Sequence, residues 1–254
     1  FPEPNPLFYE NLAWSERTRL DRLNVFSQLA RQQLPGMSAE NAHPTTIIAP
    51  IRAVMTRTIP RREFLIATQR IKVGDQRDLV QTLEKLVGIG YEYSNIVVQP
   101  AQFARRGGLI DIWSPGEPRP IRFEFFGDEI DTIKTFDPAT QRSQEALKSA
   151  QIFPASEALP EKLKTKTDEA NPVSEAKIAS IYRFHSTLLD YLPENALILL
   201  DCEEFISAAA LDIEEDSLSR REEMIRNREL DEKAPVPYFT WSELNDSFNQ
   251  KQVL

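Results

Sequence analysis

The middle of the chain carries its clearest alternation of apolar and polar residues. Two apolar-rich runs, 103–113 and 121–130, flank a break rich in proline and glycine, and the second run begins with an apolar side chain at every other position. A period of two is typical of a strand with one buried face, so the two runs predict an antiparallel hairpin. Residues 131–136 alternate again and end at Asp137-Pro138, which predicts one further strand closed by a turn.

Two helices are predicted before this sheet. Ser15 is a suitable N-cap for the first, which carries apolar residues at helical spacing. Asp75 is placed to cap the second, whose apolar residues at 79–87 lie on one helical face. Gly88 or Gly90 supplies the stop signal for this second helix.

The other segments are assigned by length and pattern. Continuous apolar or β-branched runs predict strands, apolar residues at helical spacing predict helices, and polar stretches predict loops or solvated surface. These rules predict strands at 45–49, 64–68, 70–73 and 195–200, helices at 51–55, 174–192 and 212–233, a loop at 35–44, and a surface helix or mobile linker at 161–170.

The predicted elements divide the chain into two domains of an α/β protein. Residues 73–150 form a compact α+β unit with an antiparallel sheet, and residues 1–72 and 151–254 form the two parts of a larger α/β domain. With 254 residues, of which 41% are hydrophobic, the chain is long enough to bury a core in each.

Composition narrows the class of protein. No run of about 18 apolar residues occurs, which predicts that no segment spans a membrane. The chain begins with Phe1 rather than Met, which predicts a fragment of a longer protein. Cys202 is the single cysteine, so an internal disulfide is excluded and a cytoplasmic location is expected. His43 and His185, together with this cysteine, make a poor ligand set, so we expect no metal site.

The charge of the chain argues against DNA binding by its whole surface. The formal net charge is −9 and the pI is near 5.0, whereas the phosphate backbone attracts basic surfaces. A nucleic-acid role therefore needs a local basic patch, and the alternative reading of each patch is a solvated loop or strand edge. The candidate clusters are Arg57 with Arg61 and Arg62, and Arg105 with Arg106.

The residues of the predicted sheet also form an ordered set of motifs. In chain order these are Gly90-Tyr91, Phe103-x-x-Arg106-Gly107-Gly108-x-Ile110-Asp111-Ile112, Arg122-x-Glu124-Phe125-Phe126-Gly127-Asp128-Glu129-Ile130, Phe136-Asp137-Pro138-x-Thr140 and Ile152-Phe153-Pro154-Ala155-Ser156-Glu157. The set resembles the second domain shared by the excision-repair protein UvrB and the transcription-repair coupling factor Mfd. Residues 1–29 and 238–254 resemble Mfd rather than UvrB, and we find no segment similar to the aromatic-rich hairpin with which UvrB clamps DNA.

The resemblance implies a fold and a function. The fold is expected to be a degenerate helicase-like (RecA-type) parallel-sheet domain, discontinuous in sequence, with the small antiparallel domain inserted into it. The function is expected to be that of an adaptor that binds UvrA and so recruits nucleotide excision repair to stalled RNA polymerase. The alternative is a direct DNA-binding module of a repair helicase-like protein without ATPase activity. RNA polymerase and DNA would be bound by other domains of the parent protein, and an intramolecular contact with the parent's C-terminal region is a further hypothesis.

Five residues are candidates for the UvrA-binding surface. Arg106 and Gly107 match the Arg-Gly pair of the family, Arg105 is an added neighbour, and Phe103 belongs to the same strand. Glu92 stands where the family places a further arginine, so one implied contact is lost or relocated. A guanidinium pairs with a carboxylate through two parallel hydrogen bonds, which suits an acidic partner. Strand alternation turns one of the two arginines outward, unless a bulge at the following glycines exposes both.

The sequence argues against catalysis by this chain. It contains no Gly-x-x-x-x-Gly-Lys-[Ser/Thr] loop, the element that brings backbone amides and a lysine onto nucleotide phosphates. Asp201 and Glu203 follow the apolar run at 195–200 and resemble a Walker B carboxylate and its neighbour, which we interpret as a remnant or a solvated strand end. We expect no catalytic residue and no cofactor here, and the resemblance implies that ATP is used by separate motor domains of a parent DNA translocase.

Overall fold

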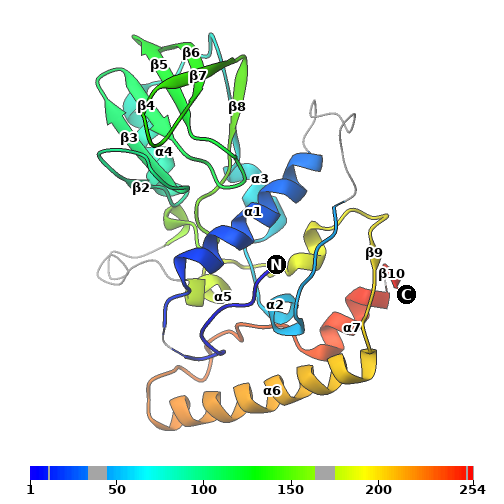
Figure 1. Cartoon of the computed structure of the whole chain (residues 1–254). Coiled ribbons are helices and arrows are strands. Elements are labelled where there is room, and N and C mark those ends of the chain that lie inside the picture. Colours follow the sequence, from blue (N-terminus) through cyan, green and yellow to red (C-terminus); the bar gives the residue numbers. More distant parts are fainter. Residues whose placement is uncertain (11, 34–44, 164–174, 250, 254) are drawn as a thin grey trace. The chain divides into compact units, whose positions relative to one another are not determined.

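The computed structural model of the chain (Figure 1) describes residues 1–10, 12–33, 45–163, 175–249 and 251–253. The chain is a mixed α/β protein with antiparallel and mixed sheets. Its contacts divide it into two compact units, of which unit 1 comprises residues 1–18, 29–61 and 174–254 and unit 2 comprises residues 19–28 and 62–173. The RecA-type arrangement, the insertion and the predicted boundaries of the inserted domain stay predictions.

A six-stranded sheet is the largest element of unit 2. Its strands lie in the order β2-β3-β4-β5-β6-β7, with β2 parallel to β3 and every other neighbouring pair antiparallel. The strands are β2 (Glu92–Tyr93), β3 (Gln102–Arg106), β4 (Leu109–Ile112), β5 (Ile121–Phe126), β6 (Glu129–Phe136) and β7 (Ser143–Leu147). A separate antiparallel pair joins β1 (Gln69–Lys72) to β8 (Ser149–Ile152), which confirms the strand predicted at 70–73.

The predicted antiparallel pairing is confirmed, but the first run divides differently. Residues 103–113 do not form one strand, because the chain reverses at the glycines that follow Arg106 and makes the β3–β4 hairpin. Gly107 has a φ of +61°, in the left-handed region that glycine adopts without a Cβ penalty. β4 then pairs with β5 across the predicted break. The second run, 121–130, also forms no single strand, because the chain turns at Gly127 and Asp128, so that β5 ends at Phe126 and β6 begins at Glu129. Residues 131–136 lie in β6.

Alternation gives the sheet one apolar face and a second face, called the polar face, on which charged residues lie beside the buried Ala104 and Phe136. The apolar face buries the side chains of Phe103, Ile110, Ile112, Ile121, Phe123 and Ile133. On the polar face the register places Ala104 opposite Asp111 and Asp111 opposite Arg122. Arg106 lies two positions after Ala104 on the same face of β3.

Helix α4 (Leu79–Gly88) is capped by Asp78, so the predicted cap at Asp75 is wrong. The Oδ1 atom of Asp78 accepts a hydrogen bond from the N–H of Gln81 at 2.8 Å, which is N-cap geometry. Asp75 instead accepts from the N–H of Lys72 at 2.9 Å and closes the turn after β1. Two aspartates precede the helix closely in sequence. The first, Asp75, belongs to the turn after β1, and the second, Asp78, caps the helix.

Helix α3 (Arg61–Ala67) occupies the place of the strand predicted at 64–68. Its buried residues are Phe64 and Ala67, which lie three positions apart on one helical face. The ring centroid of Phe64 lies 6.1 Å from that of Phe26 and 6.1 Å from that of Phe153. The prediction is wrong because packing of this aromatic cluster, rather than the short apolar run, determines the local conformation.

Helix α1 (Glu16–Gln33) begins as predicted, with the Oγ atom of Ser15 accepting a hydrogen bond from the N–H of Thr18 at 3.1 Å. The elements of unit 1 are α2 (Ile51–Met55), α5 (Ile178–Ile181), α6 (Glu203–Arg226), α7 (Trp241–Asn249), 3-10 turns at Glu175–Lys177 and Leu188–Tyr191, and the parallel pair of β9 (Leu197–Ile198) and β10 (Gln252–Val253). Unit 2 adds a 3-10 turn at Pro160–Lys162. The helical turn predicted at 51–55 is confirmed.

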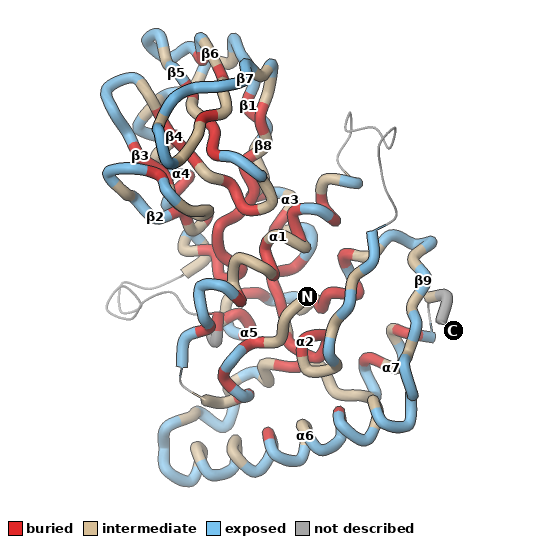
Figure 2. Tube along the Cα trace, viewed as in Figure 1, coloured by how far each residue is buried: buried red, intermediate tan, exposed pale blue. Residues whose placement is uncertain are grey.

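Unit 1 packs around a small core supplied by its helices and helical turns, together with Phe8 and Tyr238. The core contains Phe8, Val54, Met55, Leu189, Ala210, Tyr238, Leu244 and Phe248. Figure 2 shows that α6 is exposed along most of its length, and only Ala210 and Ser217 of this helix are buried. The solvated helix predicted at 212–233 is therefore confirmed as far as Arg226, where α6 ends.

Three predictions for unit 1 are wrong. Residues 45–49 form no strand, and Ile48 is 82% exposed. The run 195–200 supplies only the two-residue strand β9, and Leu199 is 70% exposed. Residues 175–192 form short turns instead of one helix, with a capping box at Thr187 that starts a new turn. An apolar run is buried only where neighbouring elements cover it, and a local pattern does not report those neighbours.

Some predicted features lie outside the described residues, namely the loop at 35–44, His43 and residues 164–170 of the polar stretch. Within the described part of the chain, no helix is both long enough and apolar enough to cross a membrane.

Candidate functional site

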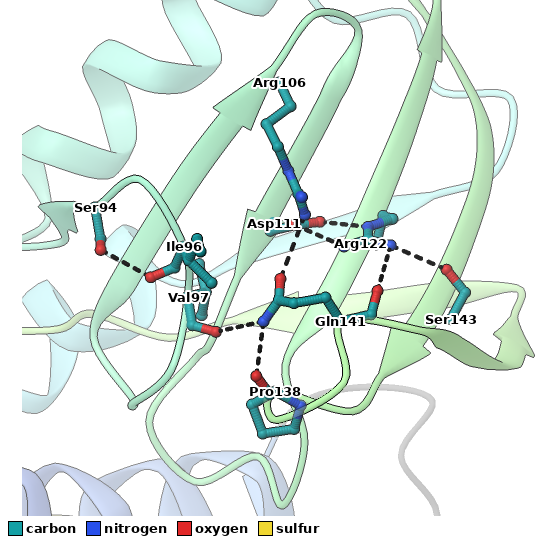
Figure 3. A network of polar contacts seen from close by, with 9 residues as sticks. All are labelled: Ser94, Ile96, Val97, Arg106, Asp111, Arg122, Pro138, Gln141 and Ser143. Carbon is teal, nitrogen blue, oxygen red and sulfur yellow. Dashed lines mark hydrogen bonds and ion pairs between the residues drawn. The ribbon is translucent and has the colours of Figure 1, made fainter.

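A network of two arginines and one aspartate lies on the polar face of the six-stranded sheet (Figure 3). Asp111 belongs to β4, Arg122 belongs to β5, and Arg106 is the last residue of β3. Asp111 faces Arg122 directly and Arg106 diagonally across the strands. The register of the sheet therefore brings together residues from three strands.

Asp111 and Arg122 form a bidentate pair. The carboxylate of Asp111, 2% exposed, accepts hydrogen bonds from Nε of Arg122 at 2.7 Å and from Nη2 at 2.9 Å. Arg122 also donates through Nη1 to the carbonyl of Gln141 at 3.1 Å and to Oγ of Ser143 at 3.3 Å. Its guanidinium lies 4.6 Å from the ring centroid of Phe136. The hydrogen bond to Asp111 raises the pKa of Arg122, so this cation is fixed in the sheet.

Arg106 shares the same carboxylate but is far more exposed. Its Nη2 atom donates to Oδ2 of Asp111 at 2.6 Å and to Oε1 of Gln141 at 3.4 Å. Its side chain is 44% exposed. Among the described residues, no hydrogen bond to Nε or Nη1 of Arg106 is present. Arg106 is therefore anchored at one nitrogen and open to solvent at the other two.

Gln141 links the network to its own turn and to the neighbouring loop at Val97. Its Nε2 atom donates to the carbonyl of Pro138 at 2.8 Å and to the carbonyl of Val97 at 3.2 Å. The backbone of Gln141 has a φ of +61°, which is uncommon for residues other than Gly, Asn or Asp. Backbone strain of this kind persists where the surrounding contacts fix the conformation. Gln141 lies at the end of the turn predicted at Asp137-Pro138, and that turn is confirmed.

The other predicted partner-binding residues lie around the β3–β4 hairpin. Arg105 and Arg106 are both exposed, because β2 pairs only with Gln102 and Phe103 and leaves this end of β3 at the edge of the sheet. Nε of Arg105 donates to the carbonyl of Gly107 at 3.3 Å. A Cβ built on Gly107 meets no atom within 4 Å. Phe103 is buried, with its ring centroid 5.6 Å from that of Tyr93. Glu92 is exposed on the edge strand β2.

The remaining candidates lie outside the sheet. Asp201 and Glu203 are exposed beside the start of α6. Arg57 donates from Nε to the carbonyl of Tyr238 at 3.1 Å, and burial lowers its pKa. Arg61 and Arg62 are exposed at the start of α3. In the part of the chain that the structure describes, no group of three or more His, Cys, Asp or Glu side chains is placed to hold a metal ion.

Sequence reasoning placed Arg106 in the site but assigned no role to its supporting residues. Asp111 and Arg122 lie within the recognised motifs, and a carboxylate in the apolar run Leu109–Ile112 is itself a signal that a cation must accompany it. Gln141 carries no such signal, because its part in the network depends on an unusual φ.

Comparison with known proteins identifies one domain of the chain. Residues 70–157 match the family model of the UvrB interaction domain. The chain is 29% identical over 225 residues to the transcription-repair-coupling factor of Bacillus subtilis, covering 74% of this chain and 18% of the relative. It is 34% identical over 135 residues to that of Myxococcus xanthus, covering 53% and 11%, and 30% identical over 157 residues to that of Haemophilus influenzae, covering 62% and 13%.

The resemblance found in the sequence is thus confirmed, since residues 70–157 match the UvrB interaction domain and the chain is similar to transcription-repair-coupling factors. It spans less than a fifth of the length of these relatives.

Proposed function

We propose that this chain is the UvrA-binding adaptor module of a transcription-repair coupling factor. In this proposal it recruits nucleotide excision repair to stalled RNA polymerase, while ATP use and the contacts with polymerase and DNA belong to other parts of the longer protein. The match of residues 70–157 to the UvrB interaction domain and the similarity to transcription-repair-coupling factors support the proposal.

The observation that carries the proposal is the state of Arg106. An arginine that is 44% exposed yet held at Nη2 by a buried carboxylate presents a fixed cation on the surface. The chain as a whole has a net charge of −9, so a local cation of this kind distinguishes the polar face from the rest of the surface. A guanidinium presented in this way suits a carboxylate on an acidic protein surface.

The neighbours of Arg106 have separate roles in the proposal. Arg105 adds a second exposed cation on the same hairpin, and Gly107 leaves open space at the turn for the partner to approach. Phe103 is buried and so supports the strand from within instead of touching the partner. Glu92 lies exposed on β2, where a carboxylate repels an acidic partner and confines the docking surface to the hairpin.

The test is calorimetric titration of UvrA with the parent chain and with Arg106→Ala. We expect micromolar or tighter binding by the parent and a loss of about 30-fold or more in the variant, equivalent to about 2 kcal/mol, as for a central interface arginine. Arg70→Ala is the matched control, because Arg70 is exposed on β1 and lies outside the hairpin. Urea unfolding of each variant reports whether the fold is intact.

The affinities of the parent and the two variants for UvrA decide the proposal. Binding that is lost in Arg106→Ala and retained in Arg70→Ala supports docking through the hairpin. Equal affinity of the parent and Arg106→Ala would overturn the proposal, and so would the absence of any binding by the folded parent.

A further inference from the structure

The carboxylate of Asp111 makes one contact more than its pairing with Arg122 requires. Arg122 alone satisfies both oxygens, through Nε to Oδ1 and Nη2 to Oδ2. A bidentate pair of this kind neutralises a buried aspartate without further help. Yet Oδ2 also receives Nη2 of Arg106 at 2.6 Å, the shortest of the three contacts.

The two arginines respond differently to the shared carboxylate. Arg122 has further acceptors in Gln141 and Ser143 and lies on the ring of Phe136, so its position does not depend on Asp111 alone. Arg106 has only Asp111 and a longer contact to Gln141 among the described residues. Removal of the Asp111 charge is therefore expected to release Arg106 first.

An anchored arginine binds a partner at lower entropic cost than a free one. The side chain of arginine has many rotamers, and a free residue loses most of this rotamer entropy when it docks. Contacts already made in the unbound protein remove part of that cost, as in other preorganised interfaces. The trio of Arg106, Arg122 and Asp111 also retains one net positive charge, which matches one partner carboxylate.

We propose that Asp111 is the positioning residue of the docking surface: it holds Arg106 through one hydrogen bond from Nη2, so that the rest of the guanidinium is presented to a carboxylate of an acidic protein. This inference rests on the proposed function, since it concerns the partner that Arg106 binds. It adds a residue that is buried, touches no partner itself, and acts only through its neighbour.

The first measurement concerns the free chain and needs no partner. Nitrogen-15 NMR of the arginine guanidinium groups should show a restrained Arg106 in the parent, with separate signals for its two Nη groups at low temperature. In Asp111→Asn these signals should merge as the side chain becomes mobile. Asp131→Asn is the matched control, because it removes an exposed carboxylate from β6 and should leave the Arg106 signals unchanged.

The second measurement is the affinity for UvrA by calorimetry. Asp111→Asn should weaken binding about tenfold, and the same substitution should change the residual affinity less than twofold when Arg106 is already alanine. A residue with a merely structural role would weaken binding equally in both backgrounds. Where Asp111→Asn folds poorly, the double variant Asp111→Asn, Arg122→Gln removes the buried carboxylate together with its partly buried bidentate partner. It is expected to fold better, since neither charge of the pair is left uncompensated.

Each outcome bears on a different claim. Restrained Arg106 signals that persist in a folded Asp111→Asn variant overturn the positioning role, whatever the affinity for UvrA. Signals that merge in the variant while the parent fails to bind UvrA refute the proposed function, and with it the claim that the anchored arginine serves this partner. Merged signals together with a tenfold loss that depends on Arg106 support both.

Discussion

At the residue scale, the ion pair of Arg22 and Glu157 is the most deeply buried charge pair among the described residues of unit 2. The Nε atom of Arg22 lies 2.6 Å from Oε1 of Glu157, Nη2 lies 3.2 Å from Oε2, and the side chains are 0% and 1% exposed. Glu157→Ala removes the carboxylate that balances this guanidinium, and breaking a buried pair on one side costs about 3–5 kcal/mol. We expect the free energy of unfolding to fall by that amount, measured from the midpoint of urea denaturation at constant slope.

A partly exposed pair in the same unit provides the control. Nζ of Lys162 lies 2.9 Å from Oε2 of Glu63, with side chains 39% and 28% exposed, and the hydrogen bond to Glu63 raises the pKa of Lys162. Because water screens such a pair, Lys162→Ala should cost less than about 1 kcal/mol. Similar losses in the two variants would contradict the argument that burial decides the cost.

A residue of the site could be predicted from the sequence where it belongs to a recognised motif. It could not be predicted where its contacts depend on the register in which the strands pair. Arg106 follows from the Arg-Gly motif in the sequence. Its anchoring by Asp111 does not, because that contact needs β3 and β4 to pair with Arg106 diagonal to the aspartate. The same holds for Arg122, which meets Asp111 only through the pairing of β4 with β5.

At the element scale, strong alternation predicted structure well and short apolar runs did not. The strands β5 and β6 follow alternation that reflects one buried face, a property the residues themselves carry. The runs at 64–68 and 195–200 carry only apolarity, which is compatible with a helix, a strand or an exposed loop. Phe64 becomes helical because it packs between Phe26 and Phe153, and such long-range contacts are absent from a local pattern.

The stop signal of α4 gives a prediction at this scale. The helix ends at Gly88, and Gly90 has a φ of +97° with a Cβ position only 2.6 Å from Cβ and 2.9 Å from the backbone nitrogen of Ser156. Gly90→Ala combines a positive-φ penalty of about 1–2 kcal/mol with a steric one of about 1–3 kcal/mol. We expect the free energy of unfolding to fall by about 3 kcal/mol or more, measured by urea denaturation.

Gly74 separates the two contributions. It has a φ of +87°, and a Cβ there meets no atom within 4 Å. Gly74→Ala should therefore cost only the conformational part, about 1–2 kcal/mol. If Gly90→Ala lowered the free energy of unfolding no more than Gly74→Ala, the close approach of the chain at Ser156 would contribute nothing to the cost of the substitution.

At the scale of the whole molecule, net charge decides between a protein partner and DNA. The chain has 30 basic and 39 acidic residues, hence a formal charge of −9. Of the arginines in the DNA-binding alternative, Arg57 is partly buried and bonded to a backbone carbonyl. Arg61, Arg62, Arg105 and Arg106 are exposed cations, and Asp111 offsets part of the charge of Arg106. Four such charges on an acidic chain are few for a phosphate-binding surface.

We therefore expect the chain to bind duplex DNA more weakly than about 100 µM at physiological salt, the weak limit of ordinary non-specific binding. Fluorescence anisotropy of a labelled duplex, titrated at low and at physiological salt, measures this directly. Each phosphate contact lowers the logarithm of the affinity by about 0.9 per unit of log salt concentration, so the slope counts the contacts that do form. Tight binding with a steep slope that falls by about two in Arg61→Ala, Arg62→Ala would establish the DNA-binding alternative. Weak DNA binding that hardly depends on salt, together with retained UvrA binding, would assign the polar face of the sheet to an acidic protein. There a local cation attracts the partner, whereas the negative field of the whole chain does not.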